Sequence, residues 1–119
     1  MRGLKIQNVW IRKILSGEKT MEVRSRRYGV LGQRIALGNS GNRLVEGYAT
    51  VQEIIKIPLK TIPEHAGRHL ATNWLFQRYG NKETLYGYCL TNVSKETKSF
   101  WYPKSPSIWF TLNKSEKTS

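Results

Sequence analysis

The sequence predicts an α+β fold: a small, mostly antiparallel β-barrel with a short N-terminal helix and a second helical insertion. Several short segments alternate between apolar and polar residues, which is typical of half-buried strands. Two other segments place apolar residues three or four positions apart, as amphipathic helices do. The chain has 119 residues, of which 39% are hydrophobic, so we expect one domain over residues 1–112 and a flexible tail over residues 113–119.

The N-terminal segment is predicted to form a strand, a helix and a second strand. Residues 3–7 are the first strand candidate, and Asn8 offers a side-chain oxygen as a helix N-cap. Gly17 can adopt the left-handed conformation that ends the helix, whose apolar face comprises Val9, Trp10, Ile11, Ile14 and Leu15. Residues 20–26 then alternate, which places Met21 and Val23 on one side of a strand and a charged set on the other, namely Glu22, Arg24 and Arg26.

A hairpin is predicted next. Residues 34–37 and 44–57 bracket the polar segment 38–43, as two strands joined by a turn do. The second of these strands is long, and Glu53 interrupts its alternation. We therefore expect a β-bulge or a change of sheet near Gln52 and Glu53.

A helical region and three further strands complete the predicted elements. The segment from Thr61 to Glu64 matches a capping box with Pro63 in the first turn. Gly67 weakens the helix, which we expect in two pieces, near residues 63–66 and 70–79. The strands are expected at residues 85–93, 99–102 and 108–112, with a turn at 94–98 between the first two.

The charge of the chain indicates an anionic partner. Twenty Lys and Arg residues stand against eight acidic ones, for a net charge of +12. This excess favours RNA or another nucleic acid, because cationic side chains that neutralise phosphates release counterions. All eight acidic residues are glutamates, so a mechanism that requires an aspartate is excluded.

Other features of the sequence bear on the cellular location of the protein and on whether it binds a metal or a cofactor. No apolar run reaches the length of about 18 residues that a membrane helix needs, and the N-terminus lacks the apolar core of a signal peptide. Cys89 is the sole cysteine, which excludes an intramolecular disulfide and a multi-cysteine zinc site. We therefore expect a cytoplasmic protein without a membrane partner. We expect no metal and no cofactor either, since Gly67 separates His65 from His69 and a capped surface helix explains both histidines.

A run of arginines predicts a surface for nucleic acid. Guanidinium groups hold phosphates, and an exposed aromatic ring beside them can stack on an unpaired base, which is how single-stranded RNA is bound. Tyr28 is such a ring, next to the candidate phosphate ligands Arg24, Arg26, Arg27, Arg34 and Arg43. A solvated basic loop is the alternative. Trp101 and Ser105 are further candidates for the border of a binding cleft.

A second candidate site combines a lysine, a glutamate and an arginine. Strand alternation puts Glu22 and Arg24 on one face, and Lys19 stands at the entrance of the same strand. The lysine could stabilise an oxyanion or contact phosphate, the glutamate could act as a general base or accept from a base edge, and the arginine could bind phosphate. The alternative is a structural ion pair between Glu22 and Arg24.

The segment that carries these residues resembles a family motif. Gly17, Lys19, Glu22 and Arg24 form the pattern G-x-K-x-x-E-x-R, preceded by a helix with Trp10. This is similar to the ASCH domain, a relative of the PUA-like RNA-binding barrels, and the resemblance extends over residues 3–112. It implies a PUA-like barrel in which the motif lines a cleft between barrel and helix. One departure is Val9, where many members have proline.

The resemblance implies several functions. Some ASCH-like proteins are amidohydrolases of acylated cytidine, but these carry a threonine nucleophile at the position of Glu22, and a carboxylate cannot replace it. Others are linked to RNA cleavage, for which Lys19 and Glu22 are the candidate catalytic residues. We expect a domain that binds RNA or a nucleotide-like ligand; the alternatives are a nucleic-acid-processing hydrolase that uses the same cleft and a protein-interaction module.

Overall fold

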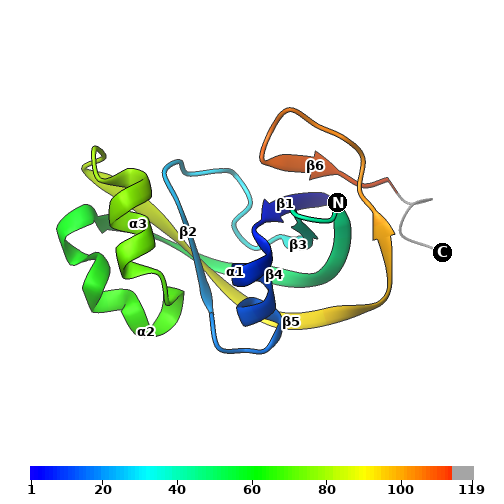
Figure 1. Cartoon of the computed structure of the whole chain (residues 1–119), viewed down its shortest axis with the longest axis horizontal. Helices are drawn as coiled ribbons and strands as arrows, with labels where there is room; N and C mark the ends of the chain where they lie inside the picture. Colours follow the sequence, from blue (N-terminus) through cyan, green and yellow to red (C-terminus); the bar gives the residue numbers. More distant parts are fainter. Residues whose placement is uncertain (114–119) are drawn as a thin grey trace.

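The computed structural model describes residues 1–113, and residues 114–119, which form most of the predicted tail, lie outside the described residues. Its elements run in the order of one strand, one helix, three strands, three helical segments and two strands (Figure 1). The strands are β1 (Arg2–Ile6), β2 (Met21–Arg24), β3 (Arg34–Asn39), β4 (Leu44–Pro58), β5 (Thr84–Trp101) and β6 (Trp109–Thr111). The helices are α1 (Asn8–Leu15), the 3-10 helix η1 (Leu59–His65), α2 (Ala66–His69) and α3 (Thr72–Tyr79).

All six strands form one sheet in the order β2-β5-β4-β3-β1-β6. Its neighbouring strands run antiparallel except for the parallel pair of β1 and β3. The predicted α+β class and the mostly antiparallel sheet are therefore confirmed. The strand pairs within residues 1–113 leave β2 and β6 at opposite ends, so the sheet is not closed into the predicted barrel.

Strands β4 and β5 form a long antiparallel pair, and the helical segments connect them at one end (Figure 1). Their register shifts between Val51 and Glu53, which confirms the predicted bulge. The predicted turn at residues 94–98 is wrong, because β5 continues through it and pairs Ser94 with Tyr48 and Lys95 with Gly47. The backbone N–H and C=O groups of a polar segment can form hydrogen bonds to a neighbouring strand as well as within a turn, so polar composition alone did not distinguish the two.

Helix α1 connects β1 to β2 along the chain and packs against β3 and β5 of the sheet. Ile11 and Ile14 are fully buried, whereas Val9, predicted on the apolar face, is 49% exposed. The predicted N-cap is also wrong, since Gln7 is the N-cap and Asn8 is the first helical residue. The Asn8 side-chain oxygen instead accepts hydrogen bonds from the side chains of Arg12 and Asn39. The end of the helix is as predicted, with Gly17 at a φ of 88°.

The helical insertion, residues 59–79, lies between β4 and β5 and covers one end of the sheet (Figure 1). It breaks at Leu70, which has a φ of 61°, rather than at Gly67. The capping box is not formed: Thr61 lies inside η1, and its hydroxyl donates to the Pro58 carbonyl. Helix propensity alone could not predict the break at Leu70 or the missing capping box, because contacts with the rest of the fold decide where a short helix begins and ends.

The insertion has a core of its own. This core includes Met21 and Val23 of β2, Ile57 of β4, Leu75 of α3 and the buried Cys89. A larger cluster packs under α1, and Trp10 contacts both clusters. Among the described residues, none of the helices combines the length and apolar character that crossing a membrane requires.

Candidate functional site

The predicted lysine, glutamate and arginine are positioned by the edge strand β2. Among residues 1–113, β2 pairs with β5 alone, and this pairing places Glu22 opposite Tyr88 and Arg24 opposite Tyr86. Lys19 lies in the turn before the strand, where its own backbone N–H donates to the Lys13 carbonyl at 2.9 Å. This turn brings the Lys19 side chain to the face of the strand that carries Glu22.

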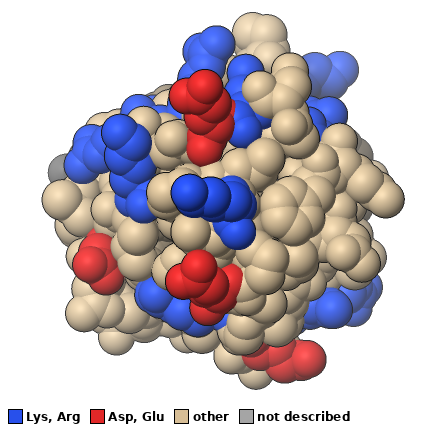
Figure 2. Space-filling model, turned by 90° about the vertical axis from the view of Figure 1, so that its left-hand side faces the viewer, with Lys and Arg blue, Asp and Glu red and all other residues tan. Residues whose placement is uncertain are grey.

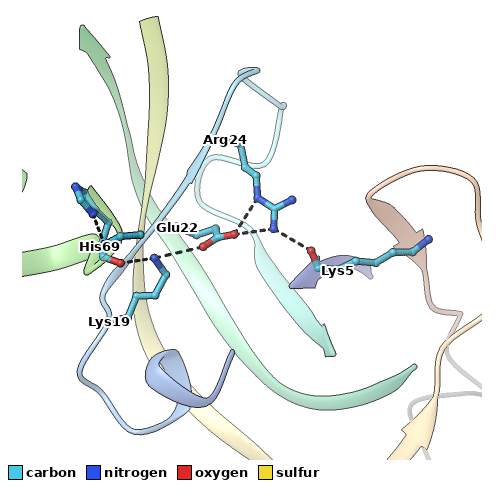
Figure 3. A network of polar contacts seen from close by, with 6 residues as sticks. Lys5, Lys19, Glu22, Arg24 and His69 are labelled. Carbon is cyan, nitrogen blue, oxygen red and sulfur yellow. Dashed lines mark hydrogen bonds and ion pairs between the residues drawn. The ribbon is translucent and has the colours of Figure 1, made fainter. Parts of the chain in front are cut away.

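Lys19, Glu22 and Arg24, which we call the triad, form a continuous chain of polar contacts (Figure 3). The Lys19 ammonium lies 3.6 Å from one carboxylate oxygen of Glu22. The other oxygen accepts from the Arg24 guanidinium at 2.6 Å through Nη2 and 2.9 Å through Nε. The predicted ion pair is therefore present, and it includes the lysine as well.

Two backbone carbonyls anchor the ends of this chain (Figure 3). Lys19 Nζ donates to the His69 carbonyl at the end of α2, at 2.5 Å. Arg24 Nη2 donates to the Lys5 carbonyl in β1, at 2.9 Å. The triad thus ties the helical insertion to β2 and β2 to β1.

The three side chains differ in their access to a ligand. Lys19 is 2% exposed and Glu22 is 6% exposed, whereas the Arg24 side chain is 15% exposed. Burial lowers the pKa of the Lys19 ammonium, and the Glu22 carboxylate partly offsets this effect. Arg24 is thus the member best placed to touch a ligand, while Lys19 and Glu22 hold it in position.

A cavity of about 570 Å³ opens over the triad. We call it the triad cavity. Its aromatic wall consists of Trp10, Trp74 and Tyr79, and Trp74 meets the other two rings edge-on at centroid distances of 5.9 and 6.3 Å. Lys5 and Arg78 add two cations that the sequence did not reveal as site residues. They come from β1 and α3, so no local spacing signals their proximity.

A second hollow, of about 670 Å³, adjoins the first. This loop hollow lies at the β3–β4 turn and the segment before β6, and the two spaces share the lining residues Lys5, Ser40 and Pro106. Arg43 and Ser105, both predicted as binding residues, line it. Trp101 lies beside it, 67% exposed, with the Arg43 guanidinium carbon 5.1 Å from its ring centre.

The remaining predicted binding residues line neither space. Arg26 and Arg27 are exposed in the loop after β2. Arg34 instead donates to Thr50, to the Asn92 carbonyl and to Ser94. Tyr28 is not the free ring that was expected, because it is half-buried and packs on Trp109 at 5.3 Å and Tyr88 at 6.5 Å.

The histidines correct another prediction. His69 is fully buried rather than part of a surface helix. Its Nδ1 accepts from the Ala71 N–H and its Nε2 lies 2.9 Å from the Ile62 carbonyl, so the ring is neutral with its proton on Nε2. Both nitrogens are thereby engaged within the fold. Burial lowers the pKa of His69, and the nearby Lys19 charge lowers it further.

The fold and the site define a class of protein: a small α+β domain with a polar cleft between its sheet and a helical insertion. No family model matches this sequence, and no curated protein matches it. Its structure is similar to ASCH from Zymomonas mobilis, with 19% sequence identity, a TM-score of 0.70 and coverage of 98% of this chain and 90% of that chain. A serine-to-alanine mutant of that protein gives a TM-score of 0.82 at 19% identity, covering 98% of this chain and 90% of its own length.

A tyrosine-to-phenylalanine mutant of the same Zymomonas mobilis protein matches equally well. Its TM-score is 0.82 at 19% identity, over 98% of this chain and 92% of that one. The chain therefore has the ASCH domain fold, and the predicted resemblance is confirmed at the level of fold.

Proposed function

We propose that this chain is an RNA-binding domain that holds an unpaired nucleotide in the triad cavity. The observation that carries the proposal is the convergence of cations and aromatic rings on one space of about 570 Å³. Ligand pockets typically measure about 300–1,000 Å³. Kinship with the PUA-like RNA-binding barrels, which the sequence motif implies, is part of this proposal.

The cations and the rings have separate roles. Lys5, Arg78 and the donors of Arg24 that the fold does not use are available for phosphate. Lys and Arg side chains are spread over the end of the molecule that carries the helical insertion (Figure 2), and the net charge of +12 attracts a polyanion to the domain. Trp74 and Tyr79 provide faces on which a base can stack, as proteins that bind single strands do. To Arg26, Arg27 and Arg34 we assign the long-range attraction of RNA rather than contacts in the cavity.

A ribonuclease or other hydrolase that uses the same cavity is the second candidate. Burial lowers the pKa of Lys19, so its ammonium gives up a proton more readily than that of a free lysine, and it lies beside Glu22. The arrangement differs from that of the acylated-cytidine amidohydrolases, because Glu22 stands where they carry threonine. We also retain the prediction of a cytoplasmic location, based on the single cysteine of the sequence.

A salt titration of RNA binding tests the proposal. Binding of a labelled ten-nucleotide single strand and of the matching duplex is followed by fluorescence anisotropy, with EDTA present and absent. We expect the single strand to bind more tightly, with a log-log slope of about −0.7 for each phosphate contact. A slope near zero, or a preference for the duplex, would contradict the proposal, and shortened RNA would favour the hydrolase.

A pair of exposed side chains supplies a matched comparison. Arg78→Ala removes a cation that lines the cavity, and Lys56→Ala removes one on β4 that lines neither space. We expect the first variant to lower the affinity for the single strand and to reduce the magnitude of the salt slope by about 0.7. The second should do neither.

A further inference from the structure

We propose that the loop hollow holds the nucleotide next to the one in the triad cavity, so that the domain binds a short single strand across Lys5 and toward Trp101. This inference rests on the proposed function and extends it to a defined path. The ligand class is an unpaired oligonucleotide of at least two or three units. Three features of the loop hollow support this path.

The first feature is continuity between the two spaces. Lys5, Ser40 and Pro106 line both, so the Lys5 side chain stands at the junction. Its ammonium donates to the Ser105 carbonyl at 2.5 Å, which fixes its position and uses one of its three donors. The remaining donors suit the phosphodiester that would link a nucleotide in one space to a nucleotide in the other.

The second feature is uncompensated positive charge. Lys5, Arg43 and Lys104 line the loop hollow, and none of the described residues that line it carries a carboxylate. The triad cavity, in contrast, contains Glu22, which already accepts from Arg24 and contacts Lys19. An anion entering the loop hollow therefore meets cations without a competing carboxylate.

The third feature is an exposed ring at the far end of the path. Trp101 is 67% exposed although it is a large aromatic residue, and the Arg43 guanidinium lies over it at 5.1 Å. Arg43 is itself fixed, because its Nε donates to the Tyr102 carbonyl at 3.0 Å. The pair forms a preordered platform in which the ring can stack on a base while the remaining guanidinium donors face phosphate.

The turn that borders the hollow is ordered without a ligand. The Asn39 side chain accepts from the Gly41 N–H at 2.8 Å, and the Asn42 side chain accepts from the Leu44 N–H at 2.9 Å. Such Asx contacts fix the backbone locally. Binding to this turn therefore costs little ordering entropy.

A length series separates this inference from the proposed function. Affinities of uridine monophosphate, di-uridine and tetra-uridine oligonucleotides are measured for the parent and for two double variants, Arg43→Ala with Lys104→Ala and Lys56→Ala with Lys60→Ala. We expect the tetranucleotide to bind at least about ten-fold more tightly than the monophosphate. The first double variant should lose that gain and keep the monophosphate affinity. The second, which removes two exposed charges outside both spaces, should keep both.

Trp101→Ala tests the platform. We expect it to weaken tetranucleotide binding about 5- to 100-fold, with Trp101→Phe restoring most of the loss, and to leave the monophosphate unaffected. Because Trp101 is exposed, its replacement should not disturb the fold, which near-ultraviolet circular dichroism checks.

The outcomes are distinguishable. A monophosphate that binds in the triad cavity without any gain from added length would overturn the path and leave the proposed function standing. Failure of every oligonucleotide to bind would overturn the proposed function. If tripolyphosphate bound as tightly as the tetranucleotide and Trp101→Ala had no effect, the hollow would be an anion site without a base, and the path would be wrong.

Discussion

The triad cavity and the loop hollow are neighbours that hold their cations in opposite ways. In the triad cavity, Lys19 and Arg24 are bound to Glu22 and to backbone carbonyls from two other elements. In the loop hollow, Arg43 and Lys104 face no carboxylate among the lining residues. Lys19 thus serves to join parts of the fold, whereas Arg43 and Lys104 keep donors for a partner. Arg24 does both, because its bonds within the fold use Nε and Nη2. The number of charges in a sequence does not show this division, because it depends on which residues a carboxylate reaches.

This contrast predicts that the largest effect on stability comes from the triad. Glu22→Gln leaves Lys19 and Arg24 without a carboxylate in a site where Glu22 is 6% exposed. We expect the free energy of unfolding to fall by about 3 kcal/mol, because removing one partner of a buried ion pair leaves the other charges uncompensated. Denaturant titration measures this change.

Glu18→Gln is the matched control for Glu22→Gln. Glu18 is exposed and accepts a hydrogen bond from Ser16 in the turn before β2. The same substitution there should change the free energy of unfolding by less than about 1 kcal/mol. Equal and small losses at both positions would show that the triad does not stabilise the fold as its geometry indicates.

The largest effect on binding is expected from the aromatic wall of the triad cavity. Trp74→Ala removes a stacking face, and we expect a loss of about 1–3 kcal/mol in the binding of uridine monophosphate. Isothermal titration calorimetry measures it, and thermal unfolding reports the separate cost of the lost contacts with Trp10 and Tyr79. Trp101→Ala is the comparison, since that ring lies by the other space and should leave monophosphate binding unchanged. If Trp101→Ala weakened the binding of uridine monophosphate and Trp74→Ala did not, the monophosphate would bind in the loop hollow rather than in the triad cavity.

The sequence predicted the triad, and it predicted Arg43 and Ser105 of the loop hollow, but it did not reveal the other cations of the two spaces. Glu22 and Arg24 are two positions apart on one strand, so strand alternation predicted their common face. Lys19 joins them from the turn before β2, and its closeness in sequence made it a candidate. Lys5 and Arg78 reach the same cavity from a distant strand and helix. Their position depends on sheet order and on the docking of the insertion, which no local spacing encodes.

The features of the fold that depend on local sequence were likewise predicted, and those that depend on tertiary contacts were not. Apolar alternation located the strands, and the interruption at Glu53 located a bulge. The continuation of β5 through residues 94–98 depends on pairing with Gly47 and Tyr48, and polar composition masked it. The break at Leu70 lies beside His69, whose ring and carbonyl bond to three other residues of the fold, so tertiary contacts rather than Gly67 set this boundary.

The buried His69, whose carbonyl accepts from Lys19 of the triad, predicts that the stability of the fold depends on pH. The pKa of His69 is lowered from its usual 6.5 by burial. In the interval between the lowered value and 6.5 the unfolded chain binds the proton and the folded chain does not, so stability falls as the pH falls through that interval. Protonation would also break the bond from the Ala71 N–H. Thermal unfolding at a series of pH values from about 7.5 to about 5 measures this loss of stability. The upper end of the interval is the pKa of histidine in the unfolded chain, about 6.5.

Two histidine variants separate this effect from the titration of the glutamates. His69→Asn should lower stability at neutral pH and flatten its dependence on pH. His65→Asn, a change in a partly exposed residue, should keep most of the parent's dependence, because burial is the largest cause of the lowered pKa of His69 and the charge of His65 is a smaller one. An identical pH dependence in the parent and in both variants would assign the effect to other groups.

The smallest expected effect is that of the arginines outside both spaces. Sequence analysis predicts that Arg26 and Arg27 contact phosphate, yet both are exposed in the loop after β2 and line neither space. At 0.15 M salt the Debye length is about 8 Å, so charges beyond that distance from the RNA contribute little. We expect Arg26→Ala with Arg27→Ala to weaken all single strands equally, to change the log-log salt slope by less than about 0.7 and to leave the melting temperature unchanged. A slope reduced by about 1.4 would instead mean two direct phosphate contacts. The bound strand would then extend over this loop, and the basic surface would be larger than the two adjoining spaces.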